Sequence, residues 1–546
     1  MTTTPHSKTP RPNILWVSFE DTNPYYGCYG DRVARTPVLD QLAADGTRYT
    51  RCFSTAGVCA PARAAIITGM YSTSIGTHHM RTTHTHPDMP ELPTPYSAVV
   101  PHYVKCFTEY LRAAGYYCTN NVKTDYQFMP PSTAWDELST DAHWRNRPDP
   151  DQPFFAVFNP TRTHESGMWP DKTPDITFDP DAIELPPYFP DTPKVREAMA
   201  RMYTNIERSD QELGELLQQL EDDGLAENTV VMHWSDHGPL PRGKRWPYDS
   251  GIRMPLIVRG RGIERDGIGL GKVDEELVST VDLGPTVLSL AGVPVPQHMQ
   301  GQPFLGEQAQ PSRNYIYAYR DRHDEAYDMV RAVRDKRFKY MRNYHTDQPY
   351  LPYIPYHNTH PIVQEMWRLH LAGELTETQS IMFQDRPAEE LYDTQVDPFE
   401  VNNLATDSAY ASELQRLRTE LNLWMDGVND LGRIPESEMV RRWYPNGQQP
   451  QTSPPIFVPI CEESPGIKPA ADSETLTGPA ALQLHCATQG ASIAYTLESD
   501  DEEASERWQL YTKPFRLEAG ETKVRARATR IGYLESKEKE ASFIIS

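Results

Sequence analysis

Three short apolar runs, each followed at once by polar residues, constrain the fold of this 546-residue chain most strongly. They are residues 13–18 (NILWVS), 154–158 (FFAVF) and 229–234 (TVVMHW). Between the second and the third, residues 194–221 carry apolar side chains at helical spacing, and residues 278–291 are expected to form one more helix beneath the sheet. Buried strands that alternate with helices predict a mostly parallel sheet flanked by helices on both faces. We therefore predict an α/β domain over residues 10–312.

A second unit is expected from residue 313. Residues 314–319, 329–333 and 338–341 have the pattern of short antiparallel strands. A later helix places Leu414, Leu417, Leu421 and Trp424 on one face. These features predict a smaller antiparallel α+β subdomain over residues 313–443.

The C-terminal part changes character. Residues 444–471 are rich in Pro, Gly and Gln, which is typical of a linker. Residues 522–530 (TKVRARATR) then alternate strictly between apolar and basic side chains, as in a half-buried strand. Together with two further strand-like runs they predict a β-sandwich over residues 472–546. The acidic run 498–503 is expected to be a solvated loop tip.

Composition excludes several classes of protein. Asp and Glu outnumber Lys and Arg by 76 to 53, a formal net charge of −23, which argues against nucleic acid or an anionic membrane surface as the main partner. The seven cysteines are scattered without a C-x-x-C pair, so neither a disulfide framework nor a zinc site is expected. No apolar stretch approaches the ~18 residues of a membrane span. The N-terminal residues lack the apolar core of a secretory signal, so we expect the cytoplasm, or the periplasm or secretion if a signal has been removed.

Cys59, Pro61 and Arg63 form the pattern C-x-P-x-R where a turn enters a short helix. Pro61 suits a first helical turn, and Gly69 suits the exit. Cys59 is therefore expected at a helix N-terminus, where free N–H groups and the helix dipole favour anions. The alternative is an inert buried thiol, the usual state of a free cysteine.

Carboxylates follow two of the predicted strands. Glu20 and Asp21 come after the first strand, and Asp236 and His237 come after the third. Because the carboxyl ends of parallel strands meet at one edge of a sheet, these side chains should converge. Such an oxygen-rich group suits Ca²⁺, with Mg²⁺ as the second choice. Either pair alone is as compatible with a helix cap or a polar loop.

These motifs together resemble the type I sulfatases, in the order in which that family has them. The resemblance spans residues 10–430, and residues 18–24 (SFEDTNP) are most similar to heparan N-sulfatase-like enzymes and bacterial polysaccharide sulfatases. It implies an alkaline-phosphatase-like fold. It rests on C-x-P-x-R at 59–63, N-V-K at 121–123, T-H-E-S at 163–166, S-D-H-G at 235–238 and G-K at 243–244.

The resemblance also implies a mechanism. A dedicated formylglycine-generating enzyme would oxidise Cys59 to formylglycine, whose hydrate attacks sulfur with support from Arg63. Lys123, His164, Lys244 and the metal would neutralise the negative charge that develops on the sulfate, and either His164 or Lys244 would protonate the leaving alcohol. The metal ligands implied are Glu20, Asp21, Asp236 and His237.

Three positions depart from the family pattern. Glu20 stands where the family usually has Asp, Asp125 where it commonly has His, and His237 where it often has Asn. A His-rich stretch downstream of Cys59 includes His79 and Arg81, which we expect in the substrate pocket; histidines of an ordinary loop are the alternative.

The expected function is therefore a sulfuric ester hydrolase acting on a sulfated sugar or polysaccharide. Residues 472–546 resemble the C-terminal domain of chitobiases and hexosaminidases, and this unit could bind glycan, cover the site or form a homo-oligomer contact. Two alternatives stay open. One is a phosphonate monoester or phosphodiester hydrolase with the same residues, and the other is a non-catalytic glycan-binding homologue.

Overall fold

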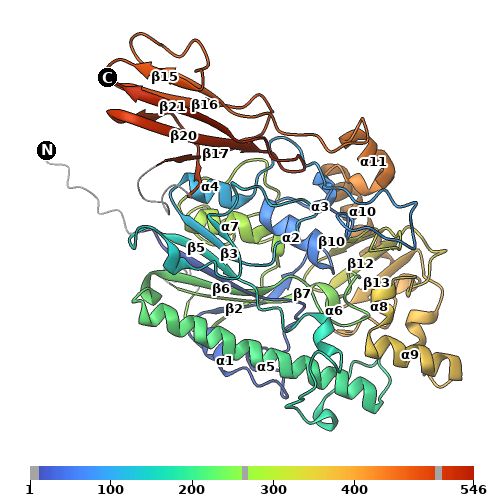
Figure 1. Ribbon diagram of the computed structural model, residues 1–546. Coiled ribbons are helices and arrows are strands. Elements are labelled where there is room, and N and C mark those ends of the chain that lie inside the picture. The colour runs from blue at the N-terminus through green and yellow to red at the C-terminus, as the bar shows by residue number, and fades with distance from the viewer. Residues whose placement is uncertain (1–10, 261–268, 499–506) are drawn as a thin grey trace.

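The computed structural model describes residues 11–260, 269–498 and 507–546 (Figure 1). The N-terminal segment inspected for a secretory signal and most of the acidic run 498–503 lie outside these ranges. Within them, nine strands form the central sheet: β1 (Asn13–Phe19), β2 (Thr47–Phe53), β3 (Tyr117–Asn121), β4 (Glu137–Leu138), β5 (Phe154–Phe158), β6 (Thr229–Ser235), β7 (Arg253–Arg259), β8 (Lys272–Asp274) and β9 (Val278–Ser279).

The order β4-β3-β5-β1-β6-β7-β2-β8 places β1 at the centre, between β5 and β6. The pairings of β1 with β5 and β6 are parallel, as is that of β3 with β5. β7 runs antiparallel to both of its neighbours, β6 and β2. The mostly parallel α/β sheet expected from the sequence is confirmed, and the ends of β1, β5 and β6 meet at one edge.

Helices cover both faces of this sheet because successive residues of β1 point to opposite sides. Leu15, Val17 and Phe19 pack towards α1 (Pro37–Ala44) and the long α5 (Pro193–Asp222). Ile14 and Trp16 pack towards α2 (Cys59–Thr68), α4 (Phe107–Ala113) and α7 (Leu283–Leu290). Figure 1 shows the two helical layers on either side of the sheet. Residues 278–291, predicted as one helix, instead begin as strand β9 and continue through a 3₁₀ turn into α7.

A second, four-stranded antiparallel sheet lies beside the first. Helix α10 (Ala411–Gly427) covers it with Leu417, Leu421 and Trp424, as the spacing predicted. Its strands are β10 (Ile316–Arg320), β11 (Val330–Arg334), β12 (Phe338–Asn343) and β13 (Glu389–Asp393). The other helices outside the two large layers are α3 (Ser72–Ile75), α6 (Asp249–Ile252), α8 (Pro355–Asn358), α9 (Pro361–Ala372) and α11 (Glu436–Trp443).

The C-terminal strands form two small sheets that enclose a core of their own. One is β14-β16-β19 and the other β15-β21-β20-β17-β18. Strand β14 lies inside the segment expected to be a linker and pairs with β16. The unit packs on the α4 side of the large domain (Figure 1), where Lys105 Nζ donates to Ser492 Oγ at 2.6 Å. The bounds are β14 (Ile456–Ile460), β15 (Ser473–Leu476), β16 (Ala480–His485), β17 (Ser492–Leu497), β18 (Gln509–Leu510), β19 (Phe515–Leu517), β20 (Gly520–Thr529) and β21 (Lys539–Ile545).

Among the residues that the structure describes, no helix combines the length and the apolar character that crossing a membrane requires.

Candidate active site

Helix α2 presents Cys59 at its first position. Val58 precedes it in extended conformation, and all ten residues of the helix are buried. Two alanines precede Arg63 in the helix and two follow it, and alanine is the strongest helix former and adds little bulk. The helix ends at Gly69, whose φ of 65° lies in the left-handed region that glycine tolerates. The expected place of Cys59 at a helix N-terminus is confirmed.

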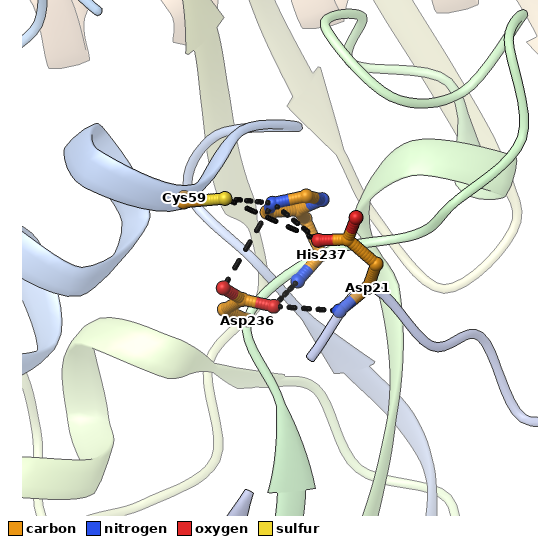
Figure 2. Close-up of side chains that lie close together, drawn as sticks. All are labelled: Asp21, Cys59, Asp236 and His237. Carbon is orange, nitrogen blue, oxygen red and sulfur yellow. Dashed lines mark hydrogen bonds and ion pairs between the residues drawn. The ribbon is translucent and has the colours of Figure 1, made fainter. Parts of the chain in front are cut away.

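Four side chains from three parts of the sequence converge at this end of α2 (Figure 2). Cys59 Sγ lies 3.1 Å from His237 Nε2, and the same nitrogen lies 3.1 Å from Asp21 Oδ1. The backbone N–H of Asp21 donates to Asp236 Oδ1 at 3.0 Å. Asp21 has a φ of 49°, a strained value for a residue with a side chain, and such strain concentrates at functional sites. The ends of β1 and β6 therefore meet the helix N-terminus as predicted.

Arg63 links this group to strand β5. Its Nε donates to Asp236 Oδ2 at 2.9 Å, and its Nη1 donates to Asn159 Oδ1 at 3.1 Å. Burial raises the pKa of Asp236, but the charges of Arg63 and His237 outweigh it and leave that pKa below its usual range. Asp236 is thus a carboxylate at neutral pH.

Lys244 brings a second positive charge to the site. Its Nζ lies 2.5 Å from Asp21 Oδ2 and 3.0 Å from Glu165 Oε1. Burial alone would lower the pKa of Lys244, but the charges of Asp21 and Glu165 outweigh it. The pKa is raised above its usual value, so the ammonium stays charged. The loop that carries it is held close to α6, since a Cβ on Gly251 would lie 2.0 Å from the Gly243 carbonyl oxygen.

His164 lies next to Lys244, with 3.4 Å between Nε2 and Nζ. Burial, followed by the positive charge of Lys244, lowers the pKa of His164 to about 4. The ring is therefore neutral at pH 7. Ser166 contacts Nδ1 of the ring through its backbone N–H at 3.3 Å and its Oγ at 2.8 Å, and Nε2 faces Lys244 in the site.

Glu20 and Lys123 form an ion pair at the edge of the group. Glu20 Oε1 lies 4.0 Å from Cys59 Sγ, and Lys123 Nζ lies 3.9 Å from Asp125 Oδ2. Burial lowers the pKa of Lys123. Glu20 also belongs to a second group that could hold a cation, in which single donor atoms of Glu20, Asp21 and His164 lie within 4.8 Å of one another.

The thiol of Cys59 is unsuited to act as a nucleophile itself. Burial raises its pKa well above the usual value, and Lys244 only partly offsets this. A thiol that stays protonated is a poor nucleophile. The site therefore needs a different group at position 59 if this residue attacks substrate.

Of the two residues predicted in the substrate pocket, one lies near the surface. Arg81 is half-buried, and its Nε lies 3.2 Å from Asp324 Oδ1. His79 is 5% exposed and packs against His78, with ring centroids 4.2 Å apart and the ring planes tilted by 47°. Among the described residues, no contact joins His79 to the group around Cys59.

The donor set fits a divalent cation. Single donor atoms of Asp21, Cys59, Asp236 and His237 lie within 4.8 Å of one another, and all four residues are buried. The His237 Nδ1–H donates to the Gly238 carbonyl oxygen at 3.1 Å, which leaves the Nε2 lone pair facing the carboxylates. Acceptors that face each other in a buried site call for a cation between them.

Comparison with known proteins agrees with this geometry. The sulfatase family model matches residues 12–293, and a second model, the N-sulphoglucosamine sulphohydrolase C-terminal domain, matches residues 237–354. An ulvan-active sulfatase of Formosa agariphila is 43% identical over 96% of this chain and 90% of its own length. This chain belongs to the sulfatase family.

More distant relatives agree in sequence and in fold. Human N-sulphoglucosamine sulphohydrolase is 28% identical to the sulfatase over 77% of this chain and 90% of its own length. The solved structure of a 2-O glycosaminoglycan sulfatase superposes with a TM-score of 0.56 at 19% identity, covering 78% of this chain and 94% of that one. The enzyme class and the alkaline-phosphatase-like fold expected from the sequence are confirmed.

Three residues of the sulfatase site were not singled out from the sequence. Asn159 follows β5 directly, and the rule that found the carboxylates after β1 and β6 would have found it too. Glu165 and Arg245 pair at 2.7 Å beneath Lys244, each 2% exposed or less. Both are adjacent in sequence to predicted site residues, and only the structure shows that they meet.

Proposed function

We propose that this sulfatase hydrolyses a sulfate ester of a sulfated carbohydrate, with a formylglycine made from Cys59 and a divalent cation. The observation that carries the proposal is the position of Cys59 Sγ, 3.1 Å from His237 Nε2 at the N-terminus of α2. The 43% identity to an ulvan-active sulfatase supports a polysaccharide-derived substrate.

Asp21, Asp236 and His237 would hold the cation, with Glu20 at the edge. When bound, the cation would stabilise negative charge on sulfate oxygens, and Ca²⁺ is preferred over Mg²⁺ because carboxylates dominate the set. The formylglycine hydrate would supply the nucleophilic hydroxyl in place of the protonated thiol. An oxygen at position 59 would also increase the oxygen share of the donor set.

The chain's own cations would bind and orient the sulfate group. Lys123 and Lys244 lie on the two sides of the buried carboxylates, and Arg63 holds Asp236 in place. Buried positive charges act strongly on the charge that develops as the S–O bond breaks. His164 Nε2 and Lys244 Nζ lie together in the site, where either side chain would pass a proton to the departing oxygen, and Lys244 is the one that is charged at pH 7.

Arg81 would recognise a further anionic group of the substrate. Its Nε contacts Asp324, while the side chain stays 35% exposed. A guanidinium with free edges suits a carboxylate or a second sulfate.

The test is a desulfation screen of the matured protein. Sulfate release is measured on oligosaccharides from ulvan and from glycosaminoglycans, beside an aryl sulfate and an aryl phosphonate monoester. We expect release from one oligosaccharide pool and a kcat/KM for the aryl sulfate above that for the phosphonate. The reverse order would favour the phosphonate hydrolase, and no turnover of any substrate would favour a non-catalytic binding protein.

A further inference from the structure

One aromatic side chain reaches the active site from the second unit of the chain. Tyr356 lies on α8, more than 100 positions after the last residue of the catalytic group. Its ring centroid lies 6.5 Å from that of His164, at an angle of 41°. The side chain of Ser166 interacts with the Tyr356 hydroxyl and offsets part of the rise in its pKa that burial causes. Tyr356 therefore stands beside the residue proposed to face the leaving oxygen.

A second aromatic residue supports this ring. Trp169 lies 6.0 Å from Tyr356 between centroids, with the planes only 25° apart. Trp169 also packs edge-on against His360, with 4.9 Å between the ring centroids. Stacked aromatic rings of this kind hold each other's orientation. Tyr356 is thus a braced ring and does not swing freely on its short helix.

The rest of α8 is anchored in the interior. Ile354 and His357 are 0% and 1% exposed, whereas Tyr356 between them is 36% exposed. A large aromatic surface left open beside a catalytic group, in a segment fixed on both sides, is typical of a ligand-contacting position.

We propose that Tyr356, backed by Trp169, forms the wall of a sugar subsite and stacks on the pyranose ring that carries the scissile sulfate. One face of a pyranose presents mainly C–H groups, and this apolar face packs on an aromatic ring while the hydroxyl groups point elsewhere. The subsite would accept a sugar sulfate and orient its ester oxygen towards His164. This proposal rests on the proposed function.

A rival role for Tyr356 follows from its hydroxyl. Ser166 Oγ lies 2.8 Å from His164 Nδ1, so Tyr356 could orient His164 through Ser166 without touching a sugar. The two roles make opposite demands on the side chain. Stacking needs the ring, and the relay needs the hydroxyl.

The experiment measures kcat and KM of the matured protein and its Tyr356→Ala and Tyr356→Phe variants. The substrates are ulvan and glycosaminoglycan oligosaccharides, and ethyl sulfate as a small ester without a ring. Tyr103→Ala is the matched control, because Tyr103 is 48% exposed and its ring contacts are His102 and His298. Thermal unfolding of each variant checks the fold.

We expect Tyr356→Ala to lower kcat/KM on the oligosaccharides about threefold to tenfold, mainly through KM, as the loss of one aromatic contact would. Tyr356→Phe and Tyr103→Ala should keep the wild-type values, and ethyl sulfate should not distinguish the variants. Wild-type kcat and KM of Tyr356→Ala on the oligosaccharides would overturn the subsite and leave the proposed function untouched. If Tyr356→Phe loses as much kcat/KM as Tyr356→Ala, the hydroxyl acts by orienting His164 through Ser166, and the stacking role is overturned. A wild type that cleaves ethyl sulfate but neither oligosaccharide pool overturns the carbohydrate substrate and the subsite with it.

Discussion

Cys59 Sγ and His237 Nε2 lie 3.1 Å apart, although 178 positions separate the two residues in the sequence. Both residues are buried. The carboxylate of Asp21 also contacts His237 Nε2, at 3.1 Å. His237 turns its lone pair towards this point because the Gly238 carbonyl holds its other nitrogen. This relationship places Cys59, the proposed reactive position, within the buried group that we propose to bind a cation.

Arg63 is predicted to be necessary for both stability and turnover. Arg63→Ala leaves Asp236 as a buried charge without its main partner, which should cost about 3–5 kcal/mol of unfolding free energy. Arg63→Lys keeps the charge but loses the fork that reaches Asp236 and Asn159 together, so it should fold better and still lose most of kcat. Denaturant unfolding and kcat check this prediction.

The control for Arg63 is an exposed arginine. Arg441 pairs with Glu438 at 2.5 Å on the surface, and such exposed pairs contribute little to stability. Arg441→Ala should change neither stability nor kcat measurably. Equal effects of Arg441→Ala and Arg63→Ala would argue against a special role for the buried pair.

The free energy of unfolding should decrease as pH falls from about 6.5 towards 4. Burial lowers the pKa of His233 to about 3 and that of His360 to about 3. In this pH range the two histidines are protonated in the unfolded chain but not in the folded chain, so acid favours unfolding. One such proton contributes a slope of about 1.4 kcal/mol per pH unit.

His233→Gln tests this pH dependence. His233 lies in the core, with its Nε2 3.0 Å from the Tyr26 hydroxyl, away from the reacting atoms. The variant should show a shallower fall of the unfolding free energy between pH 6.5 and 4 than the wild type, by about one proton. Parallel curves for the two proteins would show that His233 does not contribute.

Removal of divalent cations should inactivate the protein and lower its melting temperature. Without a cation, the acceptors of Asp21, Asp236 and His237 face one another in a buried site. Ca²⁺ should restore both properties, since a ligand that binds only the folded state stabilises it. Asp21→Asn should lose the thermal response to Ca²⁺. Full activity after chelation, with the metal content measured as zero, contradicts the cation site.

Asn159, an uncharged residue, is predicted to contribute to both stability and turnover. Its Oδ1 accepts from Ser18 Oγ and Arg63 Nη1, and its Nδ2 donates to Asn120 Oδ1. Asn159→Ala leaves these groups without a partner, which should cost about 2 kcal/mol and reduce kcat at least tenfold. The exposed Asn146→Ala is the control and should stay within about 0.5 kcal/mol of the wild type.

The sequence predicted what depends on local pattern. Apolar runs marked β1, β5 and β6, and helical spacing marked α5, because both signals lie within a single element. The prediction of a single helix over residues 278–291 was wrong. The apolar side chains run without interruption from β9 into α7, so the sequence does not mark the change from strand to helix. Tyr356 could not be placed beside His164, because that contact joins two units through packing that no local pattern encodes.

Sulfate release by Cys59→Ala, measured beside the wild type, tests whether position 59 supplies the nucleophile. Both proteins are coexpressed with a formylglycine-generating enzyme, the mass of the peptide that contains position 59 is determined, and sulfate is quantified on the best oligosaccharide substrate. We expect an aldehyde at position 59 of the wild type and a loss of at least about a thousandfold in kcat for a folded Cys59→Ala. Sulfate release by Cys59→Ala at the wild-type rate would contradict this expectation.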